Sequence, residues 1–393
     1  MKQSIVLGLG YGDEGKGLTT DYLCRQSEHP MVIRFSGGHQ AGHTVVNEQG
    51  QRHVFSHFGA GTLAGAPTYW SAFCTFNPLG FWNERQALNS LGLKPEIYID
   101  ALAPVTTPYD VAFNRKREKD KQHGSCGLGF GATVARQLTP YKLYVQDLKY
   151  AQVVKQKLKA IRSYYQQKTK ETDWLRKADK QADLFLHLTD ELYPQLNIVN
   201  ETHFFQELAL YDHLVFEGSQ GILLDMDHGF FPNVTFAHTT SMNAFILLKR
   251  NRILYDPEIY YVTRAYQTRH GNGYLSNEGI DLDYQPNPRE TNQYNLWQGQ
   301  QRVSPLDLDM LDYALACDRN YSGTMTKHLV MTCLDQVSGP IMTTRGGEMI
   351  PLENALAVAH QLEEPFAYLY ESRSDCGHLS ACELVSTFSR LPS

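Results

Sequence analysis

The sequence has no run of apolar residues that approaches the roughly 20 needed to cross a bilayer. Its first residues already break at Gly8, which is too early for the apolar core of a secretory signal. Both absences argue against a membrane-bound or secreted protein. We therefore expect no membrane partner and a cytoplasmic location.

The sequence also lacks paired cysteines and a large excess of charge of one sign. The seven cysteines are scattered and never stand in C-x-x-C spacing, so we expect neither a disulfide framework nor a zinc site. The chain has 36 Lys and Arg against 42 Asp and Glu, a net charge of −6. A mildly acidic protein has no general attraction to nucleic acid or to anionic membranes, and we expect neither as a partner.

Near its start, the sequence contains two apolar runs separated by glycines and a helical stretch. The runs at 5–7 and 31–35 each end in glycine, and 14–25 between them can form a helix. Strand, glycine turn, helix and strand in this order are typical of a βαβ unit in a parallel sheet. Further strand candidates lie at 96–99, 214–216, 259–262, 328–331 and 366–370.

Two long segments differ from the rest in composition. Residues 143–207 are rich in Lys, Gln, Leu and Asp with almost no Gly or Pro, which predicts a helical insertion. Residues 272–305 are polar, which predicts a long loop of the kind that often forms a mobile lid. The predicted fold class is α/β: a single large domain over 1–393 on a mostly parallel central sheet, with a P-loop-like first turn and helical insertions.

The first glycine turn fits two phosphate-binding motifs incompletely. Gly10-x-Gly12-x-x-Gly15 matches the dinucleotide fingerprint, but no acidic residue ends the second strand to hold a ribose. The same glycines followed by Lys16 match a P-loop, except that Gly17 stands where a Ser or Thr would hold magnesium. Bare backbone N–H groups and a helix N-terminus bind phosphate in both motifs. A phosphate cradle is therefore favoured over a turn without a ligand.

Asp13 within this turn is unexpected, because a carboxylate in a phosphate cradle repels its ligand unless it binds a metal or takes a proton. A second glycine turn, 37–44, follows the second strand and contains His43. In a parallel sheet both turns lie at the carboxyl edge, where ligands bind, so Asp13 and His43 could face one site. A carboxylate base and an imidazole acid would suit phosphoryl transfer to an oxygen.

Three blocks of the sequence resemble adenylosuccinate synthetase: 12–17 together with 37–44, then 216–240, and 265–273. The resemblance implies a C–N ligase that joins L-aspartate to IMP with hydrolysis of GTP and with Mg²⁺, giving adenylosuccinate. In this family the purine 6-oxygen is first phosphorylated and then displaced by the amine. A lactam oxygen leaves poorly until it carries a phosphoryl group, which explains the two steps.

The resemblance assigns roles to residues of both turns. Asp13 would take the N1 proton and, with the Gly42 carbonyl, hold the metal. His43 would act as the acid beside the phosphoryl group, Lys16 would stabilise its charge, and Gln220 would hold the 6-oxygen. The triphosphate would contact Gly12, Gly15, Lys16, Gly17, Gly42, His43, Thr44, Cys333 and Asp335. The purine nucleotide and the amine would contact Asp13, Gln40, Ser125, Cys126, Arg136, Gln220, Thr235 and Arg302.

The resemblance gives Arg136 a role between two chains. It resembles an arginine that reaches across the interface of a homodimer to the partner's nucleotide, so the resemblance implies a homodimer. The alternative is that Arg136 is a solvated helix residue.

Departures from the family pattern leave the substrates open. Arg302 is the single charged residue of 297–304, where the family has consecutive arginines for the two carboxylates of aspartate. Cys333 replaces a lysine that lies along the guanine base, although Asp335 keeps the acid that can read a guanine edge. Cys126 replaces a threonine that contacts phosphate, so a hydroxyl donor becomes a weak thiol. ATP is therefore the alternative donor to GTP, and the amine and the purine could both differ.

Three hypotheses compete with the synthetase of IMP, GTP and aspartate. A related ligase could use ATP, another purine nucleotide or another amine. A purine sensor without catalysis is disfavoured, because Asp13, Lys16, His43 and Gln220 are all present. An oxidoreductase dependent on NAD is the most distant hypothesis.

Overall fold

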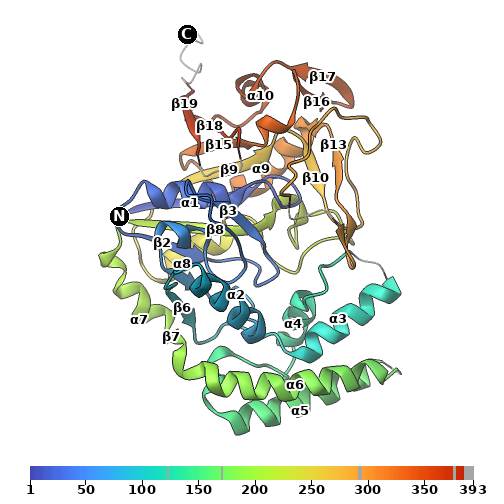
Figure 1. The fold of residues 1–393 in the computed structure, drawn as a ribbon. Coiled ribbons are helices and arrows are strands. Elements are labelled where there is room, and N and C mark those ends of the chain that lie inside the picture. Colours follow the sequence, from blue (N-terminus) through green and yellow to red (C-terminus); the bar gives the residue numbers. More distant parts are fainter. Residues whose placement is uncertain (122–123, 170, 291–293, 375–377, 385–393) are drawn as a thin grey trace.

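A ten-stranded sheet runs through the molecule (Figure 1). In this computed structural model, residues 1–121, 124–169, 171–290, 294–374 and 378–384 are described. The strand order is β19-β18-β15-β9-β1-β8-β2-β5-β6-β7. Every neighbouring pair is parallel except β18 and β19, so the predicted mostly parallel α/β fold is confirmed.

Each strand predicted from the sequence overlaps a strand of this sheet. The strands are β1 Lys2–Gly8, β2 Pro30–Arg34, β5 Thr68–Trp70, β6 Ile97–Asp100, β7 Asn197–Val199, β8 His213–Gly221, β9 Glu258–Arg264, β15 Lys327–Thr332, β18 Tyr368–Glu371 and β19 Ser380–Glu383. Sequence analysis missed β5, β7 and β19, which have three or four residues each. Such short runs show too little periodicity to be recognised.

Smaller sheets surround the carboxyl edge of the main one. Their strands are β3 His43–Val46 with β4 Arg52–Phe55, β10 Gln267–Arg269 with β13 Arg302–Ser304, β11 Tyr294–Asn295 with β12 Gly299–Gln300, and β14 Leu306–Asp307 with β16 Ile341–Arg345 and β17 Glu348–Leu352. The predicted loop 272–305 is thus partly built from the short strands β11, β12 and β13. Its residues 291–293 lie outside the described part, and its mobility stays a prediction.

Helices cover the sheet on both faces. They are α1 Lys16–Arg25, α2 Pro78–Ser90, α3 Pro108–Lys121, α4 Phe130–Gln137, α5 Ala151–Gln167, α6 Asp173–Leu192, α7 Glu201–Gln206, α8 Met242–Arg250, α9 Leu308–Ser322 and α10 Ala355–Gln361. Among the described residues, none of these helices combines the length and apolar character that a membrane span needs.

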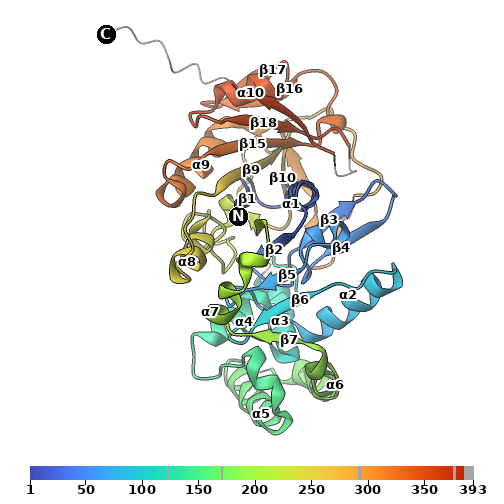
Figure 2. The same cartoon turned by 90° about the vertical axis from the view of Figure 1, so that its left-hand side faces the viewer.

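The predicted insertion 143–207 contains the long helices α5 and α6, which lie together at one end of the molecule (Figures 1 and 2). It also supplies β7, which extends the edge of the main sheet beside β6. Residues 143–207 are therefore mostly helical and also supply a strand to the sheet, while their origin as an insertion stays a prediction.

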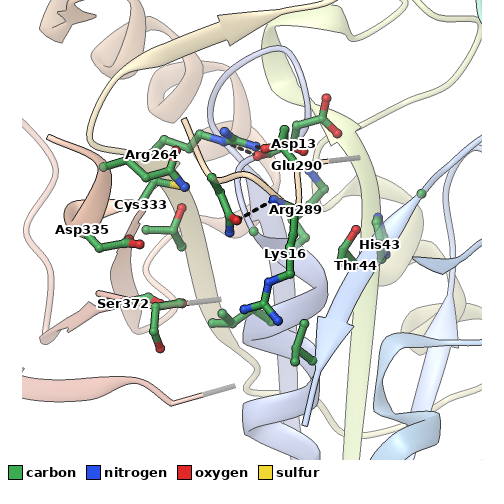
Figure 3. A pocket seen from close by; sticks show the side chains of 18 of the residues that line it. Asp13, Lys16, His43, Thr44, Arg264, Arg289, Glu290, Cys333, Asp335 and Ser372 are labelled. Carbon is green, nitrogen blue, oxygen red and sulfur yellow. Dashed lines mark hydrogen bonds and ion pairs between the residues drawn. The ribbon is translucent and has the colours of Figure 1, made fainter. Parts of the chain in front are cut away.

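The central strands bring four chain segments to one edge. The apolar residues of β1, β2 and β8 are buried throughout, as expected for parallel strands covered on both faces. The carboxyl ends of β1, β8, β9 and β15 are neighbours in the sheet. The glycine turn before α1, the start of β3 and the segment after β15 meet there around a cavity (Figure 3).

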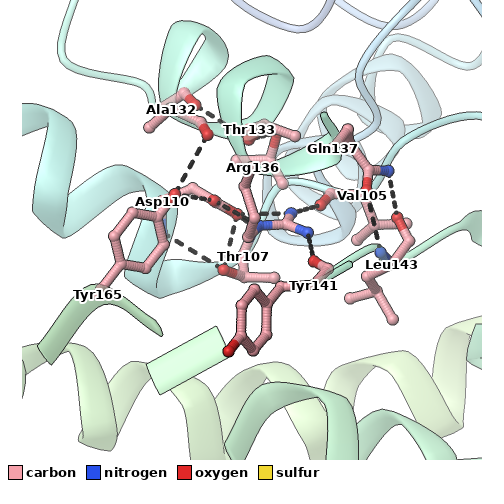
Figure 4. A network of polar contacts seen from close by, with 12 residues as sticks. Val105, Thr107, Asp110, Ala132, Thr133, Arg136, Gln137, Tyr141, Leu143 and Tyr165 are labelled. Atoms are coloured by element: carbon pink, nitrogen blue, oxygen red, sulfur yellow. Dashed lines mark hydrogen bonds and ion pairs between the residues drawn. The ribbon is translucent and has the colours of Figure 1, made fainter. Parts of the chain in front are cut away.

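Arg136 lies far from solvent, inside the layer formed by α3, α4 and α5 (Figure 4). Its Nε donates to Asp110 Oδ1 at 2.8 Å, and its Nη2 donates to Asp110 Oδ2 at 3.0 Å. The two terminal nitrogens also donate to the carbonyl oxygens of Tyr141 and Val105. Tyr165 on α5 donates its hydroxyl to Asp110 Oδ1 at 2.6 Å. This buried ion pair therefore ties the three helices together.

The contacts of Arg136 oppose the prediction that it reaches a partner's nucleotide, which this single chain does not show, and the alternative of a solvated residue is wrong. All three guanidinium nitrogens are engaged by acceptors of the same chain, and the side chain is fully buried. Pulling the guanidinium out would leave the Asp110 carboxylate buried without its charge partner, which is strongly unfavourable.

Asp110→Ala should lower the free energy of unfolding by about 3–5 kcal/mol, because it leaves the buried Arg136 guanidinium unpaired. Urea denaturation measures this loss. Asp173→Ala is the control, because it removes an exposed ion pair with Arg176 and should cost less than about 1 kcal/mol. Equal losses in the two variants would contradict the structural role of the buried pair.

Candidate functional site

Two cavities adjoin at the carboxyl edge of the main sheet. They measure about 1010 Å³ and about 1270 Å³, in both cases including space that is open to solvent. Asp13 and Gln220 line both cavities and so form their common wall.

The first cavity contains nearly all residues predicted for the triphosphate (Figure 3). They come from the glycine turn before α1, from the start of β3, and from the ends of β8 and β15. The predicted residues that line it are Gly12, Asp13, Gly15, Lys16, Gly42, His43, Thr44, Gln220, Cys333 and Asp335.

The second cavity contains most residues predicted for the purine nucleotide. The predicted residues that line it are Asp13, Gln40, Ser125, Cys126, Gln220 and Thr235. The side-chain oxygen of Gln220 and both amide atoms of Gln40 are buried and have no hydrogen-bond partner among the described residues. Buried polar atoms normally find a partner, so a polar ligand in this cavity would complete their hydrogen bonding.

Three predicted residues line neither cavity in the described structure: the buried Arg136, Gly17 and Arg302. Gly17 sits in α1, where an added Cβ would lie 2.9 Å from the Cβ of His43, so glycine lets α1 approach β3. Arg302 donates from Nη1 to both carboxylate oxygens of Glu278, and from Nη2 to two carbonyl oxygens at Gly271 and Gly273. Arg302 therefore fastens its own loop, and its role toward the amine stays a prediction.

Three residues of the site have an unusual backbone. Asp13, Gln220 and Cys333 have φ of 65°, 57° and 59°, in the left-handed region that favours glycine. Each such residue costs of order 1–3 kcal/mol, which the surrounding structure must offset. Arg264 at the end of β9 donates to the carbonyl oxygen of Asp13 at 2.5 Å, and Thr332 at the end of β15 donates to that of Glu14 at 2.6 Å. These contacts hold the turn in shape.

Glu14 fixes the turn from inside. Its carboxylate accepts the N–H groups of Gly10 at 3.1 Å and Gly12 at 2.7 Å, and it pairs with the Lys16 ammonium at 2.5 Å. Lys16 still lines the first cavity, although only a small part of it is exposed. The lysine is therefore held in one place beside the position where a phosphate would lie.

His43 is oriented by a buried carboxylate. Its Nδ1 lies 2.7 Å from Glu217 Oε1, while Glu217 Oε2 accepts the Ala60 N–H at 3.2 Å. Burial lowers the pKa of His43, although the negative charge of Glu217 opposes this shift. Since Nδ1 donates to Glu217, Nε2 is the ring atom left to meet a ligand.

Sequence analysis did not predict several charged residues that line the cavities. Arg52, Arg264 and Arg289 line the first cavity. Arg269 lines the second, where its guanidinium lies 4.3 Å from the centre of the Tyr11 ring. Burial raises the pKa of Tyr11 to about 12. Arg264 ends a parallel strand, so its position at the carboxyl edge was the one signal that could have found it.

The oxygen donors around the first cavity suit Mg²⁺. The Asp13 carboxylate and the Gly42 peptide both line this cavity, and Mg²⁺ prefers one or two carboxylates together with phosphate oxygens and water. A separate group, Asp225, Asp227 and His238, has ligand atoms within 4.8 Å of one another. Asp225 already accepts backbone N–H groups of Asp227 and Thr239, so this group shapes the turn after β8.

Comparisons with known proteins point to one family. The sequence model of adenylosuccinate synthetase matches residues 5–365. The adenylosuccinate synthetase of Blochmanniella pennsylvanica is 31% identical over 288 residues, which cover 68% of this chain and 63% of that relative, less than two thirds of its length.

Two solved structures share the fold. One is described as the fully ligated adenylosuccinate synthetase of Plasmodium falciparum, with 19% identity, a TM-score of 0.74, and coverage of 95% of this chain and 98% of that one. The other is the cyanophage S-2L succinoaminodeoxyadenylate synthetase bound to dGMP and dATP as an energy donor, with 18% identity, a TM-score of 0.63, and coverage of 96% and 93%. At these identities the structures establish the fold, and the sequence match establishes that the chain belongs to the adenylosuccinate synthetase family.

Proposed function

We propose that this protein is a C–N ligase that joins L-aspartate to IMP with hydrolysis of GTP and gives adenylosuccinate. One observation carries the proposal: the two cavities share Asp13 and Gln220, so two nucleotides could meet at one wall. The triphosphate would occupy the first cavity, between the glycine turn and Asp335. The purine monophosphate would occupy the second.

In the first step Asp13 takes the proton from purine N1, and the electron pair moves to the 6-oxygen. Gln220 holds this oxygen, which attacks the γ-phosphorus while the nucleoside diphosphate leaves. Asp13 and Gln220 lie on the shared wall, so both side chains can reach one purine ring. In the second step the amine attacks C6 and gives up one proton to the departing phosphate, which leaves with the 6-oxygen as inorganic phosphate.

Lys16 and His43 act on the transferring phosphoryl group in this proposal. Lys16 places a fixed positive charge beside it, and His43 Nε2 donates a hydrogen bond to it once the ring is protonated. Mg²⁺ bound by Asp13 and the Gly42 carbonyl would neutralise triphosphate charge. A homodimer is part of the proposal on the family resemblance alone, without any role for Arg136.

A related ligase is the second candidate. Arg302 is fastened to Glu278 outside both cavities, so an amine in the second cavity would meet Arg269 and His270 instead. Cys333 offers the donor base a thiol where the family has a lysine. The solved phage relative is bound to dGMP and dATP, so another purine and ATP are the natural substitutes to test.

Phosphate release separates the two candidates. Purified protein with Mg²⁺ is given IMP, GMP or their deoxy forms, with GTP or ATP, and with or without aspartate. Release that needs IMP, GTP and aspartate together, with a succino-purine product by mass, supports the first candidate. Release with ATP or another purine supports the second, and binding without any release would contradict both.

Asp13→Asn should lower turnover by roughly 10²–10⁴-fold, because an amide cannot take the N1 proton. Asparagine tolerates the left-handed backbone of this position, so the fold and nucleotide binding should persist. Steady-state kinetics and calorimetric binding measure the two quantities. Asp335→Asn is the matched control: it should weaken donor binding and spare the chemical step. Normal turnover in Asp13→Asn would show that another group is the base.

Triphosphate binding should be accompanied by a net uptake of protons at pH 7.5. Burial lowers the pKa of His43, so the free ring is neutral, and the incoming negative charge raises the pKa again. Calorimetry in buffers of different ionisation enthalpy measures the uptake. His43→Gln should abolish most of it. Equal uptake in both proteins would assign the proton to another group.

A further inference from the structure

One corner of the second cavity is built by helix α3. Asn114 donates from its amide to Ser125 Oγ at 2.9 Å and accepts the Gly129 N–H at 3.0 Å. Glu118 accepts the Gly124 N–H at 2.8 Å. The turn 124–129 is therefore held against α3 at both ends, and its Ser125 hydroxyl lines the cavity.

Arg117 lies on the same face of α3 as these anchors. Positions 114, 117 and 118 are three and four residues apart, which places their side chains on one side of a helix. All three line the second cavity. Unlike Asn114 and Glu118, Arg117 makes no hydrogen bond or ion pair with the described residues, and its side chain is exposed at the cavity.

The neighbouring cations of α3 are already engaged. Arg115 donates to the Gly127 carbonyl at 2.9 Å and lies over the Trp297 ring. Lys116 pairs with Asp120 at 3.0 Å and with Glu171 at 2.9 Å. Of the three basic residues at 115–117, Arg117 is therefore the one that remains for a ligand in the cavity.

The other arginine that lines this cavity in the described structure is also engaged. Arg269 donates to the carbonyl oxygens of Tyr274 and Asn233 and lies on the Tyr11 ring. The Glu118 carboxylate adds negative charge to the same corner as Ser125. A phosphate bound there would need a compensating cation.

We propose that Arg117 binds the 5′-phosphate of the purine nucleotide and completes the phosphate site within one chain. The inference rests on the proposed function, because that function places a nucleoside monophosphate in the second cavity. A guanidinium can donate two parallel hydrogen bonds to phosphate oxygens. Ser125 and Thr235 would supply the neutral donors. Arg136 does not take part, since the Asp110 pair keeps it buried.

Calorimetric binding of IMP, GMP and dGMP, compared with inosine and guanosine, tests the phosphate contact. Arg117→Gln should weaken the monophosphates by about tenfold or more and leave the nucleosides within twofold, because it removes a charge-assisted contact that only the phosphate can make. Lys119→Gln is the matched control: Lys119 is exposed on α3, does not line the cavity, and should change neither affinity.

The outcomes separate this inference from the proposed function. Unchanged monophosphate affinity in Arg117→Gln, or equal weakening of the nucleosides, overturns the role of Arg117 alone. A wild-type protein that binds no purine monophosphate overturns the proposed function and this inference with it.

Mixing the Asp13→Asn and Arg117→Gln proteins tests whether the arginine serves its own chain. If it does, no mixed dimer holds an intact site, and turnover should not rise above that of the separate variants. Recovered turnover would place Arg117 in the partner's site and overturn the assignment to one chain.

Discussion

The glycine turn after β1 keeps its shape at the cavity because neighbouring strands hold it from the other side. Arg264 and Thr332, at the ends of β9 and β15, donate to the carbonyl oxygens of Asp13 and Glu14. A turn of bare glycines has no shape of its own, since glycine adopts many backbone conformations at little cost. The order of the strands in the sheet therefore determines the geometry of the site.

Charged side chains in this protein have two different roles. Arg136 and Arg302 each satisfy their guanidinium groups with acceptors of their own chain, and each stabilises a local arrangement. Lys16 and His43 are also paired with carboxylates, but these pairs leave an atom that faces a cavity. The two groups differ in the position of the partner carboxylate. For Arg136 and Arg302 the carboxylate and the guanidinium lie away from the cavities, whereas for Lys16 and His43 the carboxylate lies behind a side chain that lines a cavity.

The sequence allowed much of the fold to be predicted and part of the site. Long buried strands and the two glycine turns have local signatures, and they were found where the structure has them. Strands of three residues such as β5 have none. The hydrogen-bond partners of Arg136 and Arg302 could not be predicted from the sequence. An arginine in a sequence gives no sign of whether its acceptor will be a ligand or a residue distant in the chain, such as Asp110 or Glu278. The left-handed backbone of Gln220 and Cys333 could not be read from the sequence either, because neither residue type favours that conformation.

That backbone has a consequence for how the protein can change. At Asp13, Gln220 and Cys333 a glycine would relieve strain in the folded state. The same replacement would remove a side chain from the wall of a cavity. Under the proposed function, a glycine at any of these three positions would therefore favour stability at the expense of activity, and a search for more stable variants would tend to select less active proteins.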